Sequence, residues 1–232
     1  LVVRAADILE NWDCQASLDS VGACVFYPFL DRYWQRNYLF DALGDDLFKL
    51  MPLAAPGLNR FDFKTFTKEA SPWSQHREIL NEIVHKEMRV VMERLHESLG
   101  PEESAWRWGD LHQIAFWHRQ RKRPGFEHLK VGPDPIGGSP TTLGMAVHMG
   151  KGPGKPVENE IPCRVFHGPA YRLVVDLGDH QHARFVIAGG NGGRPDSEFA
   201  TNQYSAWLRG DYFTLNLRRD EIDVHEIWQV EG

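Results

Sequence analysis

Histidine is the residue type whose abundance first suggests chemistry, because imidazole binds metal ions and exchanges protons near neutral pH. The chain has eleven histidines in 232 residues. His180 and His182 are spaced to share one face of a strand, but no carboxylate or cysteine pattern completes a metal site there. A charged turn beside a hairpin is the preferred interpretation. His112 and His118 fall on one side of an alternating segment, and we interpret both as core histidines, so no metal site is predicted.

Motifs for nucleophilic catalysis and phosphate binding are incomplete in this chain. The Gly-x-Ser-x-Gly nucleophile turn of a serine hydrolase is absent, and segment 137–140 (GGSP) predicts an ordinary turn. The glycine-rich segment 189–193 lacks the Gly-Lys-Ser/Thr ending of a P-loop. It predicts a flexible turn whose bare backbone lets another segment approach closely.

Arg172 and Asp176 are the charged residues best suited to a structural ion network. They stand four residues apart on the face of a predicted strand that does not carry Tyr171. If that face is buried, both charges need partners, because an unpaired buried charge is costly.

The first hundred residues, which must support these groups, predict helices. Ala5, Ile8, Leu9 and Trp12 have the spacing of one helix face. A second, aromatic apolar segment spans 21–40. We expect Asp19 or Ser20 to cap this segment and Pro28 to kink it or to lie in its first turn. A third helix is expected to have Ser71 as its N-cap and to stop at Gly100 and Pro101.

Further along the chain the apolar period changes from about 3.6 to 2. A Gly/Pro-rich loop with a short strand near 143–147 is followed by two alternating segments, 171–177 and 183–188, which predict a β-hairpin. Ser197 caps a predicted helix over 198–209, ended by Gly210, and 212–217 predicts a further strand. This order predicts an α+β fold. The expected portions of one domain, 1–232, are 1–100 (helical layer), 101–123 (Trp-rich segment), 124–162 (loop) and 163–232 (hairpin, short helix and strand).

Composition narrows the classes of protein. With 42% apolar residues, 25% charged residues and a net charge of −6, the chain is predicted to fold, to be soluble and to have no nucleic-acid partner. No apolar run predicts membrane insertion, and residues 1–7 carry charge too early for a signal peptide. The three cysteines predict buried thiols, with a Cys14–Cys24 bridge left open. Eight tryptophans indicate an aromatic core or, alternatively, a sugar-binding surface.

Four segments in order resemble the penicillin amidase family. Residues 8–13 and 19–26 are similar to the family pattern L-x-x-W-D … D-S-x-x-A-x-x-F, and residues 106–118 to W-x-W-G-x-L-H-x-x-x-F-x-H. Residues 167–176 resemble H-G-P-S-Y-R-x-V-x-D. Residues 190–212 resemble the family's fourth pattern but depart from it at 193–196 and 200–202, and 139–142 is a loose version of G-D-S-x-T-V.

The resemblance implies the C-terminal part of a β chain in a four-layer αββα N-terminal-nucleophile hydrolase. In that family a precursor cuts itself, and the first residue of the β chain attacks an N-acyl amide with its own α-amine as base. The nucleophile, the oxyanion hole and the common calcium ligands lie in a part that does not map onto this sequence. Leu1 has no nucleophilic atom. The chain is therefore expected to hold no catalytic residue and to be inactive alone.

By the same resemblance, Arg172, Asp176 and His167 are expected to support the site or the self-processing step. The expected partners are the α chain, the N-terminal part of the β chain and an acyl-amide substrate, and the expected compartment is the periplasm or the exterior. Calcium is expected only in the part of the β chain outside this sequence. Two alternatives are a non-catalytic carbohydrate- or ligand-binding module and an inactive family member.

Overall fold

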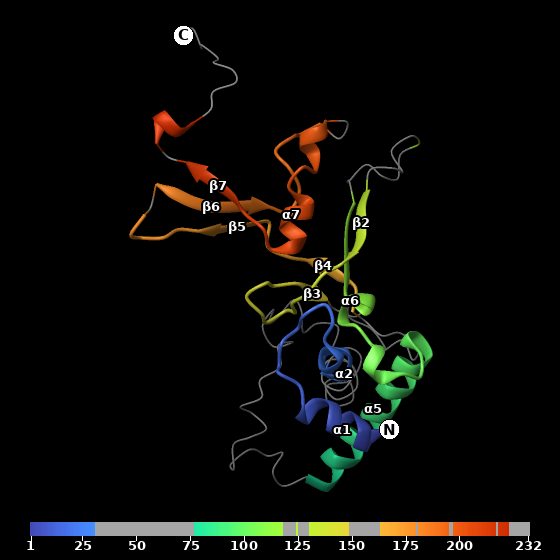
Figure 1. Cartoon of the computed structure of the whole chain (residues 1–232). Coiled ribbons are helices and arrows are strands. Elements are labelled where there is room, and N and C mark those ends of the chain that lie inside the picture. Colours follow the sequence, from blue (N-terminus) through green and yellow to red (C-terminus); the bar gives the residue numbers. More distant parts are fainter. Residues whose placement is uncertain are drawn as a thin grey trace, which may run out of the picture. The chain divides into compact units, whose positions relative to one another are not determined.

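The computed structural model of the chain resolves into two compact units, which are considered separately (Figure 1). The structure describes residues 1–30, 77–117, 124, 130–148, 163–179, 181–194, 197–216 and 218–222. The first unit holds Leu1–Phe116 and Gly132–Gly168, and the second holds Trp117–Val131 and Pro169–Gly232. The predicted division of one domain into four portions stays a prediction.

Three helices form the core of the first unit: α1 (Val2–Glu10), α2 (Val21–Leu30) and α5 (Arg77–Leu99). The Ser20 hydroxyl accepts a hydrogen bond from the Ala23 N–H at 3.1 Å, so Ser20 is the cap of α2. Pro28 lies inside α2. The expected continuation of α2 to residue 40 and the expected start of α5 at Ser71 lie outside the described residues.

Helix α5 packs one apolar stripe into this core. Met88, Val91, Met92 and Leu95 are all buried and follow the i, i+3, i+4, i+7 spacing of one helix face. Helix α5 ends before Gly100, which takes a left-handed φ of 92°, as the predicted stop required. Because Met92 and Leu95 are fully enclosed, truncating either to alanine would cost about 2–5 kcal/mol.

A four-stranded sheet follows the short helices η3 (Glu103–Ala105) and α6 (Trp108–Leu111). Its order is β2-β1-β4-β3, with β1 (Gln113–Trp117) parallel to β4 (Val165–His167), and β4 antiparallel to β3 (Val147–His148). A short strand was expected near 143–147; the structure places it at Val147–His148, so only Val147 of the expected range lies in it.

Strand β2 (Lys130–Pro135) was not expected, because two prolines and Gly132 disfavour a strand on sequence grounds. Gly132 has a φ of 82°, and a Cβ there would lie 2.5 Å from the carbonyl oxygen of Ile114. The absence of a side chain is therefore what lets the backbone of β2 approach β1.

The second unit contains a three-stranded antiparallel sheet in the order β5-β6-β7. Strands β5 (Tyr171–Val174) and β6 (His182–Ile187) form the predicted hairpin, and β7 (Phe213–Asn216) is the predicted return strand. The short 3₁₀ helix η5 (Arg219–Glu221) follows β7.

The helix predicted over 198–209 is interrupted, which corrects that prediction. It consists of the 3₁₀ turn η4 (Glu198–Ala200) and the helix α7 (Tyr204–Arg209). Between them, the backbone N–H of Gln203 donates to the carbonyl of Gly189 at 3.0 Å, so it is not used within a continuous helix. The predicted boundaries are confirmed: the Ser197 hydroxyl accepts from the Phe199 N–H, and Gly210 ends α7 with a φ of 79°.

The cysteines answer one open question and correct one expectation. All three thiols are free, so the alternative Cys14–Cys24 bridge is not formed. Cys14 is exposed instead of buried, whereas Cys24 and Cys163 are buried as expected. Burial, and to a smaller extent the charge of Asp110, raise the pKa of Cys24 to about 12, so its thiol stays protonated.

None of the described helices combines the length and apolar character that crossing a bilayer requires.

Candidate functional site

A group of buried polar and aromatic side chains in the first unit, called here the histidine cluster, consists of Tyr27, Trp108, His112, Ser139 and His148. The His112 ring stacks on Trp108 with centroids 4.4 Å apart and meets His148 nearly at right angles at 4.8 Å. Tyr27 stacks on Trp108 at 5.1 Å. Helices α2 and α6, the loop after β2 and strand β3 thus meet at one point.

Residues 106–112 build this cluster through hydrogen bonds to the glycine-rich loops around them. Trp106 and Trp108 donate their indole N–H groups to the carbonyls of Gly100 and Gly138 at 2.9 and 3.0 Å. The Nδ1 atom of His112 lies 2.6 Å from the carbonyl of Ile136 and donates to it. The motif therefore fastens the loop after β2 to the helical layer, and His112 is a core histidine as predicted. His118 lies outside the described residues.

Burial keeps both imidazoles neutral. It lowers the pKa of His112 to about 4, and the carbonyl groups of Ile136 and Ala146 offset part of that effect. Burial, and then the neighbouring His112, lower the pKa of His148 to about 3. Burial raises the pKa of Tyr27, although its hydrogen bond with Ser139 acts in the opposite direction. These groups are uncharged at neutral pH and enclosed, so the cluster serves packing better than proton transfer to a substrate.

The second unit places Arg172 against Trp207. The Arg172 Nη1 atom donates to the Trp207 carbonyl at 2.8 Å, and its guanidinium carbon lies 4.9 Å from the centre of the indole ring. Trp207 in turn donates its indole N–H to the carbonyl of Pro169 at 3.1 Å. Burial lowers the pKa of Arg172, partly offset by Tyr212. Arg172 therefore holds α7 onto the sheet by a hydrogen bond and a cation–π contact.

The other two residues of the predicted supporting network lie elsewhere. Asp176 follows β5 and is exposed, and its carboxylate accepts the Gly178 N–H at 2.8 Å. No ion pair joins Arg172 to Asp176 in the described part of the chain. His167 belongs to β4 of the first unit, where its side chain is exposed. Participation of these three residues in processing stays a prediction.

The glycine-rich loop after β6 lies against the 199–200 backbone. A Cβ on Gly190 would overlap the carbonyl oxygen of Phe199, and one on Gly192 would lie 2.9 Å from the Ala200 nitrogen. The close approach of another segment, which the glycine-rich sequence 189–193 predicted, is therefore present. The buried Gln203 locks the two segments together, because its side chain accepts the Ile187 N–H and donates to Asn191.

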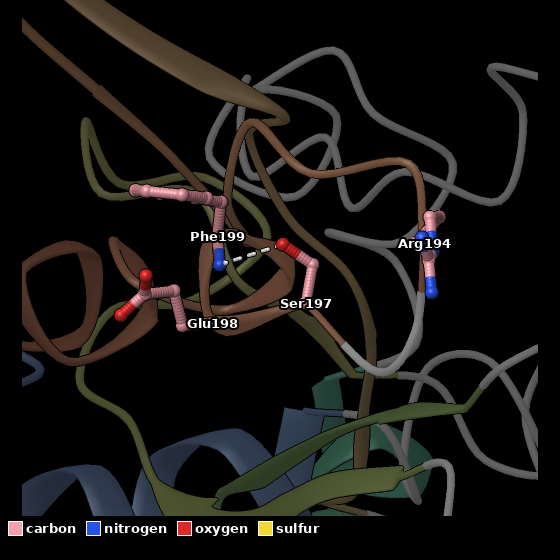
Figure 2. Close-up of a pocket in the computed structure, with 4 residues that line it drawn as sticks. All are labelled: Arg194, Ser197, Glu198 and Phe199. Atoms are coloured by element: carbon pink, nitrogen blue, oxygen red, sulfur yellow. Dashed lines mark hydrogen bonds between the residues drawn. The ribbon is translucent and has the colours of Figure 1, made fainter.

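An open pocket of about 380 Å³ lies beside this loop (Figure 2). Arg194, Ser197, Glu198 and Phe199 line it, which gives one cation, one anion, one hydroxyl and one aromatic ring. Figure 2 shows that the Ser197 hydroxyl is directed to the Phe199 N–H, the bond that caps η4. Among the described lining residues there is no histidine, and no hydrogen bond joins the Glu198 carboxylate to the Ser197 hydroxyl, so the pocket suits binding better than hydrolysis.

The sequence analysis did not predict that two carboxylates bind His182, an arrangement called here the clamp on His182. Its Nδ1 atom lies 2.9 Å from a carboxylate oxygen of Asp179, and its Nε2 atom lies 2.7 Å from Glu221. The hydrogen bonds to Asp179 and then Glu221 raise the pKa of His182. The three-residue spacing of Asp179 and His182 in the turn could have indicated the contact between these two residues. Both ring nitrogens face carboxylates, which fits the charged turn that was predicted. In the described ranges no group of three or more His, Cys, Asp or Glu side chains is arranged so that it could hold a metal ion, and His180 lies outside those ranges.

A comparison with known protein families agrees with the mixed helix-and-sheet structure and the tryptophan-rich motif of this chain. The sequence model of the family described as penicillin amidase matches residues 2–224. The chain belongs to the penicillin amidase family.

The curated relatives are named as acyl-homoserine lactone acylases. The chain is 28% identical to an acyl-homoserine lactone acylase QuiP of Pseudomonas aeruginosa, over 61% of this chain and 17% of the relative. It is similar to proteins of the same name from Pseudomonas putida (24% identity, 92% of this chain, 26% of the relative) and Pseudomonas fluorescens (26% identity, 93% and 26%). The chain thus spans about a quarter or less of the length of these relatives.

Proposed function

We propose that this chain is a scaffold portion of an N-acyl amide hydrolase whose nucleophile is supplied by polypeptide outside it. The observation that carries this proposal is the penicillin amidase match over residues 2–224 in a chain a quarter as long as its relatives. Two serines of the motifs and loops examined for catalysis support it, because Ser139 is fully buried and Ser197 caps η4. The two histidines of the histidine cluster support it too, because His112 and His148 are enclosed and neutral.

The proposal includes the larger assembly. The chain is the C-terminal part of a large subunit with the four-layer αββα fold, derived from a self-cleaving precursor and exported to the periplasm. Its partners are the small subunit and the rest of the large subunit, and any calcium ion binds in that missing part. The reaction is attack on an amide carbonyl, loss of the amine, and hydrolysis of the acyl-enzyme to a carboxylic acid.

The first substrate class to test is the N-acyl-homoserine lactones, because the relatives carry that name. A carbohydrate-binding function is less well supported. Trp106, Trp108 and Trp207 are fully enclosed, and so present no face on which a sugar could stack.

The test is purification of the native assembly that contains this chain, followed by intact-mass analysis and N-terminal sequencing. We expect a co-purifying chain that begins with Ser, Thr or Cys, and release of free fatty acid from an N-acyl-homoserine lactone by the assembly but not by this chain alone. As control, alanine at the first position of that partner should abolish release without dissociating the assembly. A folded, solitary chain in the native extract would overturn the proposal.

A further inference from the structure

One face of the sheet in the second unit is entirely apolar, and we call it the sheet face. The pairing of Leu173 with Phe185, and of Phe185 with Phe213, runs in one row across the three strands. Tyr171 pairs with Ile187, and Ala183 with Leu215. Side chains two residues apart in a strand point the same way, so these seven residues share a face. The face carries no charged residue.

The large side chains at the edges of this face are strongly exposed. The exposed fractions are 59% for Tyr171, 48% for Leu173, 47% for Phe213 and 44% for Leu215. Each would release water on being covered, at roughly 25 cal/mol per Å² of apolar area. Contiguous apolar surface of this kind marks an interaction site when it occurs on a folded chain.

The opposite face of the same sheet is more polar, and helix α7 covers part of it. It bears Arg172, which contacts Trp207 of α7, and Val186, which is fully buried. It also bears His182, Arg184, Thr214 and Asn216, in register with one another. An antiparallel sheet with one face in water normally presents its polar face. In this unit helix α7 lies against the polar face at Arg172, whereas the large side chains at both edges of the apolar face are exposed.

We propose that the sheet face is the docking surface for an apolar layer carried by the rest of the acylase polypeptide. The inference rests on the proposed function and adds to it the surface through which the scaffold is held. Two observations favour this occupant. The relatives are about four times longer than the chain, which leaves ample polypeptide outside it. The face also lacks charge, so it matches the interior of a layered domain rather than a charged or sugar ligand.

The experiment measures association of this chain with the rest of its precursor, produced as a separate polypeptide, by titration calorimetry. In the test variant, Leu173→Lys and Phe213→Lys place two charges on the sheet face. Two control substitutions, combined in one control variant, add the same two charges elsewhere: Thr214→Lys on the opposite face of β7, and Leu143→Lys at a fully exposed site of the first unit. Thermal unfolding of each variant alone, and its mass in solution, are measured alongside.

We expect the double variant to weaken association at least about tenfold, as loss of central apolar contacts does, with unchanged unfolding temperature. The control variant should change it less than about twofold. Association that the double variant leaves intact would overturn the inference while the proposed function stands. Absence of both association and amide hydrolysis in the wild type would overturn both. A wild-type dimer split by the double variant would assign the face to a second copy, and a lowered unfolding temperature would assign it to this chain's own first unit. Either result would overturn the proposed occupant.

Discussion

Two neutral imidazoles inside the first unit, His112 and His148, make its stability depend on pH. The pKa of each is lower in the folded chain than the ordinary value of 6.5, because burial disfavours the charged ring. The unfolded chain therefore binds more protons than the folded chain at mildly acidic pH. The stabilisation is complete above pH 6.5 and is lost as the pH falls toward about 4 for His112 and about 3 for His148.

We expect the free energy of unfolding to fall between pH 6.5 and 5, a range in which exposed carboxylates are still largely ionised. His112 alone would contribute on the order of 3 kcal/mol over its whole range. Urea unfolding at a series of pH values measures this slope. The variant His112→Asn with His148→Asn should be less stable at pH 7 but lose the slope between pH 6.5 and 5. An unfolding midpoint that is constant across that range in the wild type would contradict the prediction.

A second prediction at the residue scale tests whether Arg172 stabilises the fold by packing on Trp207 or belongs to a charge network for processing. Arg172→Leu removes the hydrogen bond to Trp207 and the contact with its ring, and should destabilise the fold by about 1–3 kcal/mol. Arg184→Leu is the matched control, since Arg184 is exposed on the same face of the neighbouring strand. Chemical unfolding provides the comparison. In the assembled enzyme, unchanged precursor processing and turnover in Arg172→Leu would remove Arg172 from any processing network.

At the scale of elements, the loop after β6 depends on the absence of side chains at particular glycines. Gly190→Ala would force the new methyl group into the Phe199 carbonyl, and we expect a loss of roughly 2–4 kcal/mol. Gly193→Ala is the control, because a Cβ there meets no atom within 4 Å, and should change stability by less than about 1 kcal/mol. Thermal unfolding followed by circular dichroism measures both. Equal unfolding temperatures for the two variants would show that the loop does not hold this close approach in solution.

Element boundaries were predictable where the determining interaction is local in sequence. The Ser20 and Ser197 caps act within three residues of themselves, and Gly100 and Gly210 end helices through their own φ angles. Strand β2 and the break before α7 were not predictable. Both depend on partners distant in sequence, namely Ile114 for Gly132 and Gly189 for Gln203. Periodicity and caps carry no information about such contacts.

At the scale of the whole molecule, the sequence predicted the family and the α+β class, because ordered motifs along the chain identify both. It identified the members of the candidate sites less well. Arg172 was expected beside Asp176, but its side chain lies against Trp207 of α7. The four-residue spacing of Arg172 and Asp176 along a strand carries no information about this contact. The clamp on His182 depends on Glu221, which lies 39 residues away. Tertiary pairing, not residue type, decides which charged groups meet.

The exposed thiol of Cys14 has a practical consequence. Cys24 and Cys163 are buried, so a maleimide dye added to the native protein should react at Cys14 first. The natural sequence therefore already provides an attachment point in the first unit for a fluorophore. Energy transfer from that dye to one placed on the polypeptide that we propose completes the acylase would follow the proposed assembly in real time, without substituting a residue of this chain.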